Sequence, residues 1–186
     1  MQRCAWCGTD PLYQAYHDTE WGKPCFDDRY LFAMLCLEAM QAGLSWLTVL
    51  KKRARYYDVF ANFDPAIIAQ FDAAKVDQLM KDAGIIRHRG KIEAIINNAN
   101  CYLNITRTQS FCDYLWALSP NGLAKIPLDN HPKTLADIPT KTDFSEKMSK
   151  RLKQDGFKFV GSTICYAFMQ AVGMVNDHVA HCNFRH

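Results

Sequence analysis

A single carboxyl group interrupts the most apolar helical segment of this 186-residue chain. Within residues 30–50 the only charged side chain is that of Glu38. Leu31, Met34 and Leu35 recur at helical spacing, and Glu38 stands at the next position of the same stripe. Because a helix that is apolar on nearly all sides is buried, the sequence predicts a carboxylate among core residues.

A buried charge is costly unless it has a partner, and two kinds of partner are open to Glu38. One is an internal Lys, an internal Arg or a helix N-terminus, which would make the carboxylate part of the core. The other is a ligand. The next residues favour a ligand, because they break the helical pattern and include a leucine expected at the surface and a tryptophan: Gln41, Gly43, Leu44 and Trp46.

The rest of the chain has the pattern of an all-α protein. With 49% hydrophobic and 22% charged residues it is an ordinary globular chain, and its length suits one domain, residues 1–186, of two helical lobes that share a groove. Residues 1–26 look irregular, 119–141 contain four prolines and read as a long connection, and a short turn is expected near 176–181. Caps and periodicity predict helices at about 27–42, 45–57, from 64 onward, 72–84, 90–105, 110–116, 143–154 and 161–172.

The sequence favours a cytosolic location. No apolar run reaches the length of a membrane span, and the N-terminus lacks the apolar region of a signal peptide. In a reducing compartment the eight cysteines are thiols, metal ligands or small core residues rather than disulfides.

Two cysteines and two histidines near the chain ends form a candidate metal site: Cys4, His17, His178 and Cys182. Such a set makes a closed, tetrahedral structural zinc site, which here would tie the two ends together. Cys7 competes for this role through a Cys4-x-x-Cys7 pair, and His181 competes at the other end. The alternative is a set of buried thiols and exposed histidines.

Residues 75–100 read as two helices joined by a short basic turn, residues 84–90. This pattern resembles a helix-hairpin-helix DNA-binding element, in which backbone amides and a helix N-terminus bind one phosphate. The turn lacks the usual Gly-x-Gly centre, so an ordinary helical hairpin remains an alternative. The net charge of +3 is small, but basic clusters at 51–55, 87–91 and 147–158 would form a phosphate-binding surface if the fold gathers them on one face.

Taken together, several stretches resemble the bacterial 3-methyladenine DNA glycosylase I family over nearly the whole chain, from Cys4 to Cys182. The stretches that carry the resemblance are residues 10–13, 16–18, 20–22, 37–38, 41–46, 83–92, 156–161 and 175–178. Cys7 and Met40 depart from the family pattern.

The resemblance implies a helix-hairpin-helix DNA glycosylase fold with one structural Zn2+ per chain, held by Cys4, His17, His178 and Cys182. It also implies a base pocket that contains Glu38, Tyr16 and Trp46, in which we expect Glu38 to be the catalytic and recognition residue. We expect Trp6, Tyr13 and Trp21 to form further walls of this pocket. Leu44 would fill the space of the extracted base, and Gln41 would face the orphan partner. The expected DNA contacts are Gln41, Gly43, Leu44, Gly84, Arg87, His88, Arg89, Gly90 and Lys91.

The expected reaction is base-excision repair. The enzyme would bind double-stranded DNA containing 3-methyladenine, hydrolyse the N-glycosidic bond, release the free base and leave an abasic site. No lysine stands in a motif suited to Schiff-base chemistry, so we expect a monofunctional enzyme. It would act as a monomer on the bacterial nucleoid, in the cytoplasm and away from membranes. The rival functions are a non-catalytic DNA-binding module and a zinc hydrolase with an open metal site.

Overall fold

The structure, a computed structural model, describes residues 1–185. Within that range the chain forms ten α-helices and two very short strands. The all-α prediction is therefore confirmed to the extent that the fold is mostly helical, and the strand pair was not predicted. The helices are α1 Pro11–Thr19, α2 Asp28–Gln41, α3 Trp46–Leu50, α4 Arg53–Val59, α5 Pro65–Ile68, α6 Ala73–Leu79, α7 Arg89–Ile105, α8 Phe111–Trp116, α9 Asp143–Gln154 and α10 Ser162–Ala171. Short 3-10 turns stand at Ala5–Cys7, Ala61–Phe63, Gly122–Ala124 and Leu135–Asp137.

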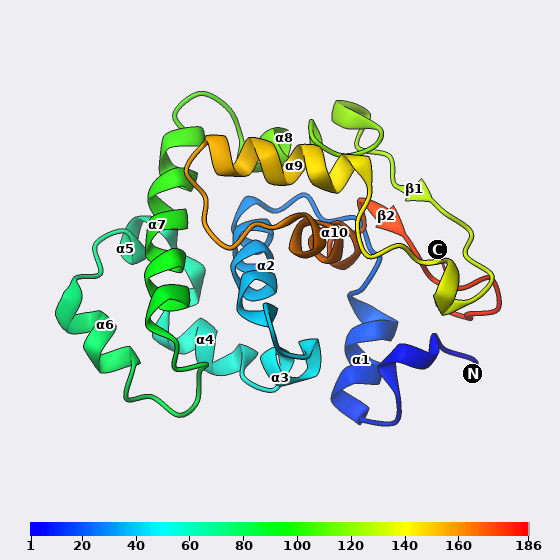
Figure 1. Cartoon of the computed structure of the whole chain (residues 1–186), viewed down its shortest axis with the longest axis horizontal. Helices are drawn as coiled ribbons and strands as arrows, with labels where there is room; N and C mark the ends of the chain where they lie inside the picture. The colour runs from blue at the N-terminus through cyan, green and yellow to red at the C-terminus, as the bar shows by residue number, and fades with distance from the viewer. Residues whose placement is uncertain (186) are drawn as a thin grey trace.

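Helix α2 lies at the centre of the molecule, with α7 on one side and α10 on the other (Figure 1). Asp27 caps it by accepting a hydrogen bond from the backbone N–H of Tyr30 at 2.7 Å. Every residue from Leu31 to Met40 is buried, including Glu38. The predicted central, all-round buried helix is therefore present, and the carboxylate lies inside it.

Most predicted helix starts are confirmed by their caps. The side chains of Ser45, Asp64, Asp72 and Ser110 each accept a backbone N–H of the first helical turn. Two predicted helices differ from those of the structure. The one expected over 45–57 is divided at residues 51–52 into α3 and α4, and the one expected over 72–84 ends at Leu79.

The prediction that residues 1–26 are irregular is wrong, because α1 lies within them. Asp10 caps this helix by accepting from the N–H groups of Leu12 and Tyr13, and Pro11 occupies its first position. The same Asp-Pro signal marks the start of α5. In residues 1–26 the many aromatic residues, together with the glycines and prolines among them, concealed this signal.

The long connection over 119–141 is confirmed, but it contains strand β1, Leu128–Asp129. This strand pairs in parallel with β2, Val175–Asn176, which opens the segment expected to form only a short turn. The chain ends also meet, since Gln2 and Asn183 exchange two hydrogen bonds at 2.6 and 2.9 Å (Figure 1). No helix in residues 1–185 is long and apolar enough to cross a membrane.

Gly173, directly after α10, tests how tightly this region is packed. It has a φ of +68°, and a Cβ there would lie 2.3 Å from backbone atoms of Lys23 and Pro24. Gly122 also has a positive φ, +56°, but a Cβ there meets nothing within 4 Å. We expect Gly122→Ala to cost about 1–2 kcal/mol of unfolding free energy and Gly173→Ala to cost clearly more, measured by urea denaturation. Equal losses would contradict the packing described.

Candidate functional site

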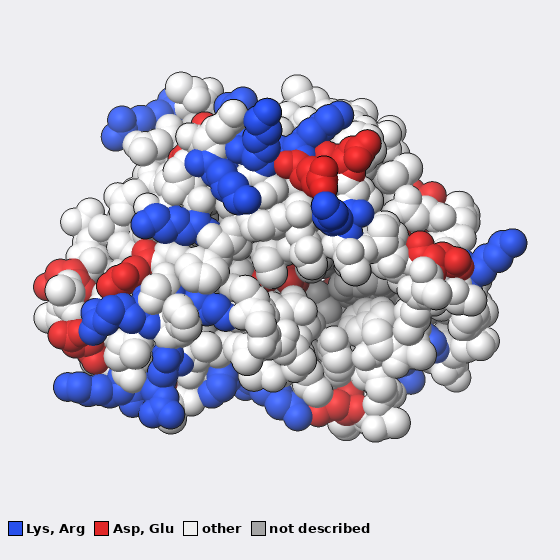
Figure 2. All heavy atoms as spheres, in the orientation of Figure 1, with Lys and Arg blue, Asp and Glu red and all other residues white. Residues whose placement is uncertain are grey.

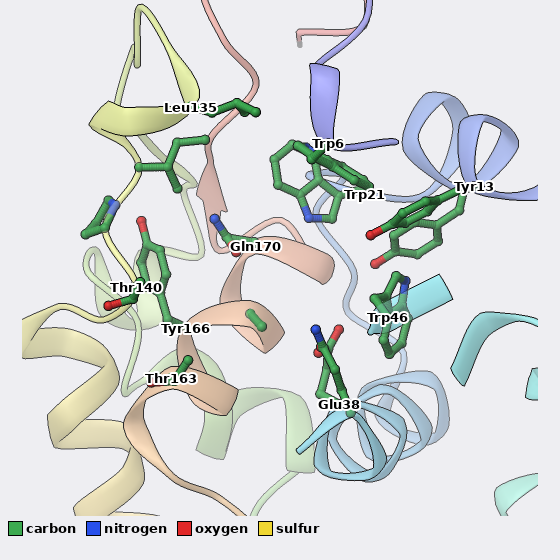
Figure 3. Close-up of a pocket in the computed structure, with 15 residues that line it drawn as sticks. Trp6, Tyr13, Trp21, Glu38, Trp46, Leu135, Thr140, Thr163, Tyr166 and Gln170 are labelled. Carbon is green, nitrogen blue, oxygen red and sulfur yellow. The ribbon is translucent and has the colours of Figure 1, made fainter. Parts of the chain in front are cut away.

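A cavity of about 380 Å³ opens beside the C-terminal half of α2. It appears as a hollow in the middle of the face shown in Figure 2. The six residues predicted to form a pocket all line it, and Gln41 joins them. In Figure 3 the labelled aromatic side chains Trp6, Tyr13, Trp21 and Trp46 stand on one side of the cavity and Leu135, Thr140, Thr163 and Tyr166 on the other. Their functional roles stay predictions at this point.

Glu38 is the chemically unusual group of the cavity. The residue is only 3% exposed, and its Oε2 atom is buried without a hydrogen-bond partner. Among residues 1–185 no Lys or Arg forms an ion pair with it, so the internal-salt-bridge interpretation is wrong. Burial raises the pKa of this carboxyl to about 8. The group therefore holds a proton near neutral pH and ionises readily when a positive charge approaches.

The aromatic wall comes from three parts of the chain. The ring of Trp6 lies 4.9 Å from the rings of both Tyr13 and Trp21, and the rings of Tyr16 and Trp46 lie 5.5 Å apart. Burial first, and the nearby Glu38 carboxylate second, raise the pKa of Tyr13 to about 12 and that of Tyr16 well above its usual range. These tyrosines are therefore neutral, and their ring faces suit a flat, cationic ligand.

Two further polar atoms of the cavity lack partners. The indole N–H groups of Trp6 and Trp46 are buried and form no hydrogen bond within the described residues. Buried polar groups are normally hydrogen-bonded, and leaving one unpaired costs about 1–3 kcal/mol. The residues that carry these three unpaired atoms, Glu38, Trp6 and Trp46, all line one cavity. This arrangement is expected of a site that binds a polar aromatic molecule.

The opposite wall was not predicted from the sequence. It consists of side chains spaced along one face of α10, Thr163, Tyr166 and Gln170, together with residues of the 119–141 connection: Leu135, Ile138, Pro139 and Thr140. Fully buried Asp177 orients this wall, because its carboxylate accepts hydrogen bonds from Tyr166 and Gln170, each at 2.7 Å. The helical spacing of the α10 residues was the available signal, but nothing in it indicated that this face lines a cavity.

The four predicted metal ligands lie together behind the aromatic wall. One ligand atom from each of Cys4, His17, His178 and Cys182 lies within 4.8 Å of the others, and all four residues are buried. The Sγ atom of Cys182 is 3.5 Å from His17 Nε2 and 3.3 Å from His178 Nδ1, and Cys4 Sγ is 3.6 Å from the same Nδ1. This group could hold a metal ion.

The surroundings of the cluster orient its histidines. His17 Nδ1 lies 2.8 Å from Asp18, and His178 Nε2 lies 3.2 Å from the Trp21 carbonyl, so the opposite ring nitrogens face the thiols. Burial raises the pKa of the Cys4 thiol, which means that a thiolate there needs a nearby cation. Cys7 points elsewhere and donates to the Cys4 carbonyl, and the Cys/His cluster does not include His181.

The loop after α2 carries the residues predicted to contact DNA at the pocket. Gly43 has a φ of +76°, which lets the chain reverse between α2 and α3. Leu44 is 44% exposed at its tip, unlike most leucines of this chain. Ser45 then caps α3, so Trp46 enters the cavity wall two residues after the exposed leucine.

The predicted basic turn joins α6 to α7. His88 caps α7 by accepting from the backbone N–H of Lys91, and Arg89 forms ion pairs with Asp77 and Glu93. Arg87 is exposed and has no ion pair within residues 1–185. Lys91 differs from the expectation of a DNA contact, because its side chain is buried and turned toward α2.

The basic clusters partly converge on this turn. The ammonium group of Lys52 donates to the Ala83 carbonyl at 2.6 Å, and Arg55 pairs with Asp82 at 2.8 Å. The ring of Phe159, next to Lys158, lies 6.3 Å from that of His88. Figure 2 shows Lys and Arg side chains above, to the left of and below the hollow. A basic border along an aromatic cavity suits a polyanion whose aromatic group enters the cavity.

Comparison with known proteins gives consistent matches over the whole length. The family model described as methyladenine glycosylase matches residues 6–186. DNA-3-methyladenine glycosylase 1 of Escherichia coli K12 is 53% identical, covering 98% of this chain and 96% of its own, and the DNA-3-methyladenine glycosylase of Haemophilus influenzae is 48% identical, covering 97% and 96%. A solved structure of 3-methyladenine DNA glycosylase I from Staphylococcus aureus, determined to explain 3-methyladenine recognition, superposes with a TM-score of 0.94 at 40% identity and covers 100% of this chain and 97% of its own.

The pKa of Glu38 makes stability depend on pH. Between pH 4.5, where the unfolded carboxyl ionises, and about pH 8, the folded protein holds a proton that the unfolded chain has lost. Stability from this group is therefore full below pH 4.5 and falls as pH rises toward 8, by about 1.4 kcal/mol per pH unit. We expect Glu38→Gln to lack this decline, so that its unfolding free energy minus that of the wild type increases from pH 5 to pH 8 in urea denaturation. Parallel pH profiles would contradict the burial of an unpaired carboxyl.

Proposed function

Because the chain belongs to the methyladenine glycosylase family, we propose that it is a DNA-repair glycosylase that removes 3-methyladenine from double-stranded DNA. The observation that carries the proposal is Glu38, a buried carboxyl without an internal partner in an aromatic cavity. In our proposal the enzyme acts as a monomer on the bacterial nucleoid, in the cytoplasm.

The cavity suits the chemistry of the damaged base. An adenine methylated at N3 is positively charged while it is attached to the sugar, and it is already a good leaving group. The rings of Tyr16 and Trp46 would stack on this cation, and its approach would shift Glu38 to the carboxylate form that accepts hydrogen bonds from the exocyclic amine. Normal adenine offers no such charge, and its bond to the sugar is much stronger.

Access to the base requires that it leave the helix. Base flipping costs a few kcal/mol, and less for a damaged base. The exposed Leu44 would fill the vacated space while Gln41 faces the orphan partner. Residues 84–90 would bind the phosphate backbone of the DNA as a helix-hairpin-helix. The N-terminus of the 17-residue helix α7 and the unpaired guanidinium group of Arg87 would face the phosphate.

The final step is hydrolysis. Water attacks C1′ of the sugar and gives up one proton to the solvent. The bond to the base breaks, the cationic base leaves with the bonding electrons as neutral 3-methyladenine, and an abasic site remains. Among the described residues, no lysine lines the cavity, which supports a monofunctional mechanism because strand cleavage by a lyase step needs an amine that forms a Schiff base with C1′.

We propose that the cluster of Cys4, His17, His178 and Cys182 binds one structural Zn2+. Tetrahedral zinc with ordinary bond lengths sets sulfur–nitrogen separations at about 3.6 Å. Three thiol–nitrogen pairs of the cluster, Cys4–His178, Cys182–His17 and Cys182–His178, lie 3.3–3.6 Å apart. Four protein ligands leave no position for a catalytic water, so the ion would join the chain ends and take no part in hydrolysis.

Product analysis tests the function directly. We expect the protein to release free 3-methyladenine from methylated duplex DNA, with the strand intact until alkali cleaves the abasic site. Glu38→Gln should reduce the rate on the order of 100-fold, and the matched control Glu146→Gln, an exposed carboxyl on α9, should not. Binding without base release would favour a non-catalytic DNA-binding module, and cleavage before alkali treatment would show a lyase.

Metal removal tests the zinc proposal. We expect one zinc per chain by elemental analysis, and a strong chelator or Cys182→Ala should unfold the ends or the whole protein, because structural zinc supplies on the order of 10 kcal/mol of folding energy. The readouts are circular dichroism and thermal melting. Loss of excision with an unchanged melting curve would show instead that the metal is catalytic.

A further inference from the structure

Lys91 is the third residue of α7, and its side chain is buried. The residue is 5% exposed, and its ammonium group donates to two backbone carbonyls, that of Met40 at 2.8 Å and that of Ala42 at 2.6 Å. Within residues 1–185 no carboxylate forms an ion pair with it. Such an ammonium is held by carbonyl dipoles alone, in contrast to neighbouring Arg89, which is exposed and paired with acids.

The two carbonyls belong to the C-terminal end of α2. Ala42 is the C-cap residue, and the last carbonyls of a helix have no partner inside the helix and carry its negative dipole end. The Lys91 ammonium satisfies two of them. Burial also lowers the pKa of Lys91, so this contact is maintained against the cost of desolvating a charge.

The contact joins α7 to the end of α2, because Met40 and Ala42 lie 51 and 49 residues before Lys91 in the sequence. On one side it leads directly into Gly43 and the exposed Leu44, whose backbone N–H returns to the Gln41 carbonyl at 2.6 Å. On the α7 side, Lys91 stands three residues after His88, which caps α7 at the end of the basic turn. One ammonium therefore sets the spacing between the turn 84–90 and the loop 41–44, and it holds the helix end two residues after Glu38.

We propose that Lys91 is a positioning residue, whose buried ammonium holds the loop that carries Leu44 at a fixed place relative to the phosphate-gripping turn. This inference rests on the proposed function. A phosphate held by the turn and a base displaced by Leu44 belong to one DNA strand, so their spacing must match the distance between the flipped nucleotide and the gripped backbone. Lys91 acts through the loop and does not contact DNA.

Salt dependence separates this role from a phosphate contact. Each neutralised phosphate contributes about 0.9 to the slope of log affinity against log salt. For binding to a duplex with a stable abasic-site analogue, we expect Lys91→Met to leave the slope unchanged, while Arg87→Met, at the exposed and unpaired cation of the same turn, lowers it by about one. A lower slope for Lys91→Met would overturn the inference, because it would show that the ammonium reaches DNA.

Excision kinetics test whether Lys91 acts through the loop. In single turnovers with saturating enzyme, we expect Lys91→Met to release 3-methyladenine on the order of 10- to 100-fold more slowly than the wild type, as for a small misplacement of a reacting pair. In a Leu44→Ala background the same substitution should cost much less, because the loop then has no wedge to position. An undiminished effect in that background, or an unchanged rate, would overturn the inference.

Two controls keep the outcomes distinct. Circular dichroism and thermal melting must show a folded protein at the assay temperature, and if Lys91→Met does not fold, Lys91→Gln, which retains a donor for one carbonyl, is compared in the same way. Absence of 3-methyladenine release by the wild type would refute the proposed function itself. Release by the wild type together with a reduced salt slope in the variant would refute only the positioning role.

Discussion

The burial of one carboxyl group, that of Glu38, is the constraint on which the proposed function of the cavity depends. Glu38 lies on a helix that is buried from Leu31 to Met40, and no internal cation or hydrogen-bond donor offsets the burial of its Oε2 atom. Replacing it with a well-packed apolar side chain would remove that cost. In the proposed function the partner of this group is the ligand, because a cationic base gains most from a carboxyl that ionises on its arrival.

The cavity around Glu38 is assembled from distant segments, and the Cys/His cluster connects them. His17 follows Tyr16 of the aromatic wall, and His178 follows Asp177, which orients the opposite wall on α10. A metal bound to both histidines would hold the two walls at a constant separation. On the other side of α2, Lys91 holds the helix end against the basic turn. The cavity is thus supported from two sides, while Glu38 Oε2 and the indole N–H groups of Trp6 and Trp46 stay unpaired.

Much of this arrangement could be predicted from the sequence, because its signals are local. The position of Glu38 on an apolar helical stripe predicted that its carboxyl group is buried. Capping residues predicted where most helices begin. The two walls of the cavity could not be predicted equally well. The aromatic residues stand out by type, but Gln170 and Tyr166 line the cavity only because the chain returns across α2, and helical spacing alone does not distinguish a cavity wall from core. The burial of Lys91 could not be predicted for a related reason: its ammonium bonds to the end of a helix that is far away in sequence.

The most direct test of the account is the titration of the Glu38 carboxyl itself. Carbon-13 NMR of protein labelled at glutamate side chains, with the signal assigned by its absence in Glu38→Gln, would follow ionisation from pH 4 to pH 9. The account predicts a midpoint far above 4.5, near 8, in the free protein, and a change of the signal when free 3-methyladenine is added. A midpoint at the ordinary value, with no response to the base, would contradict it.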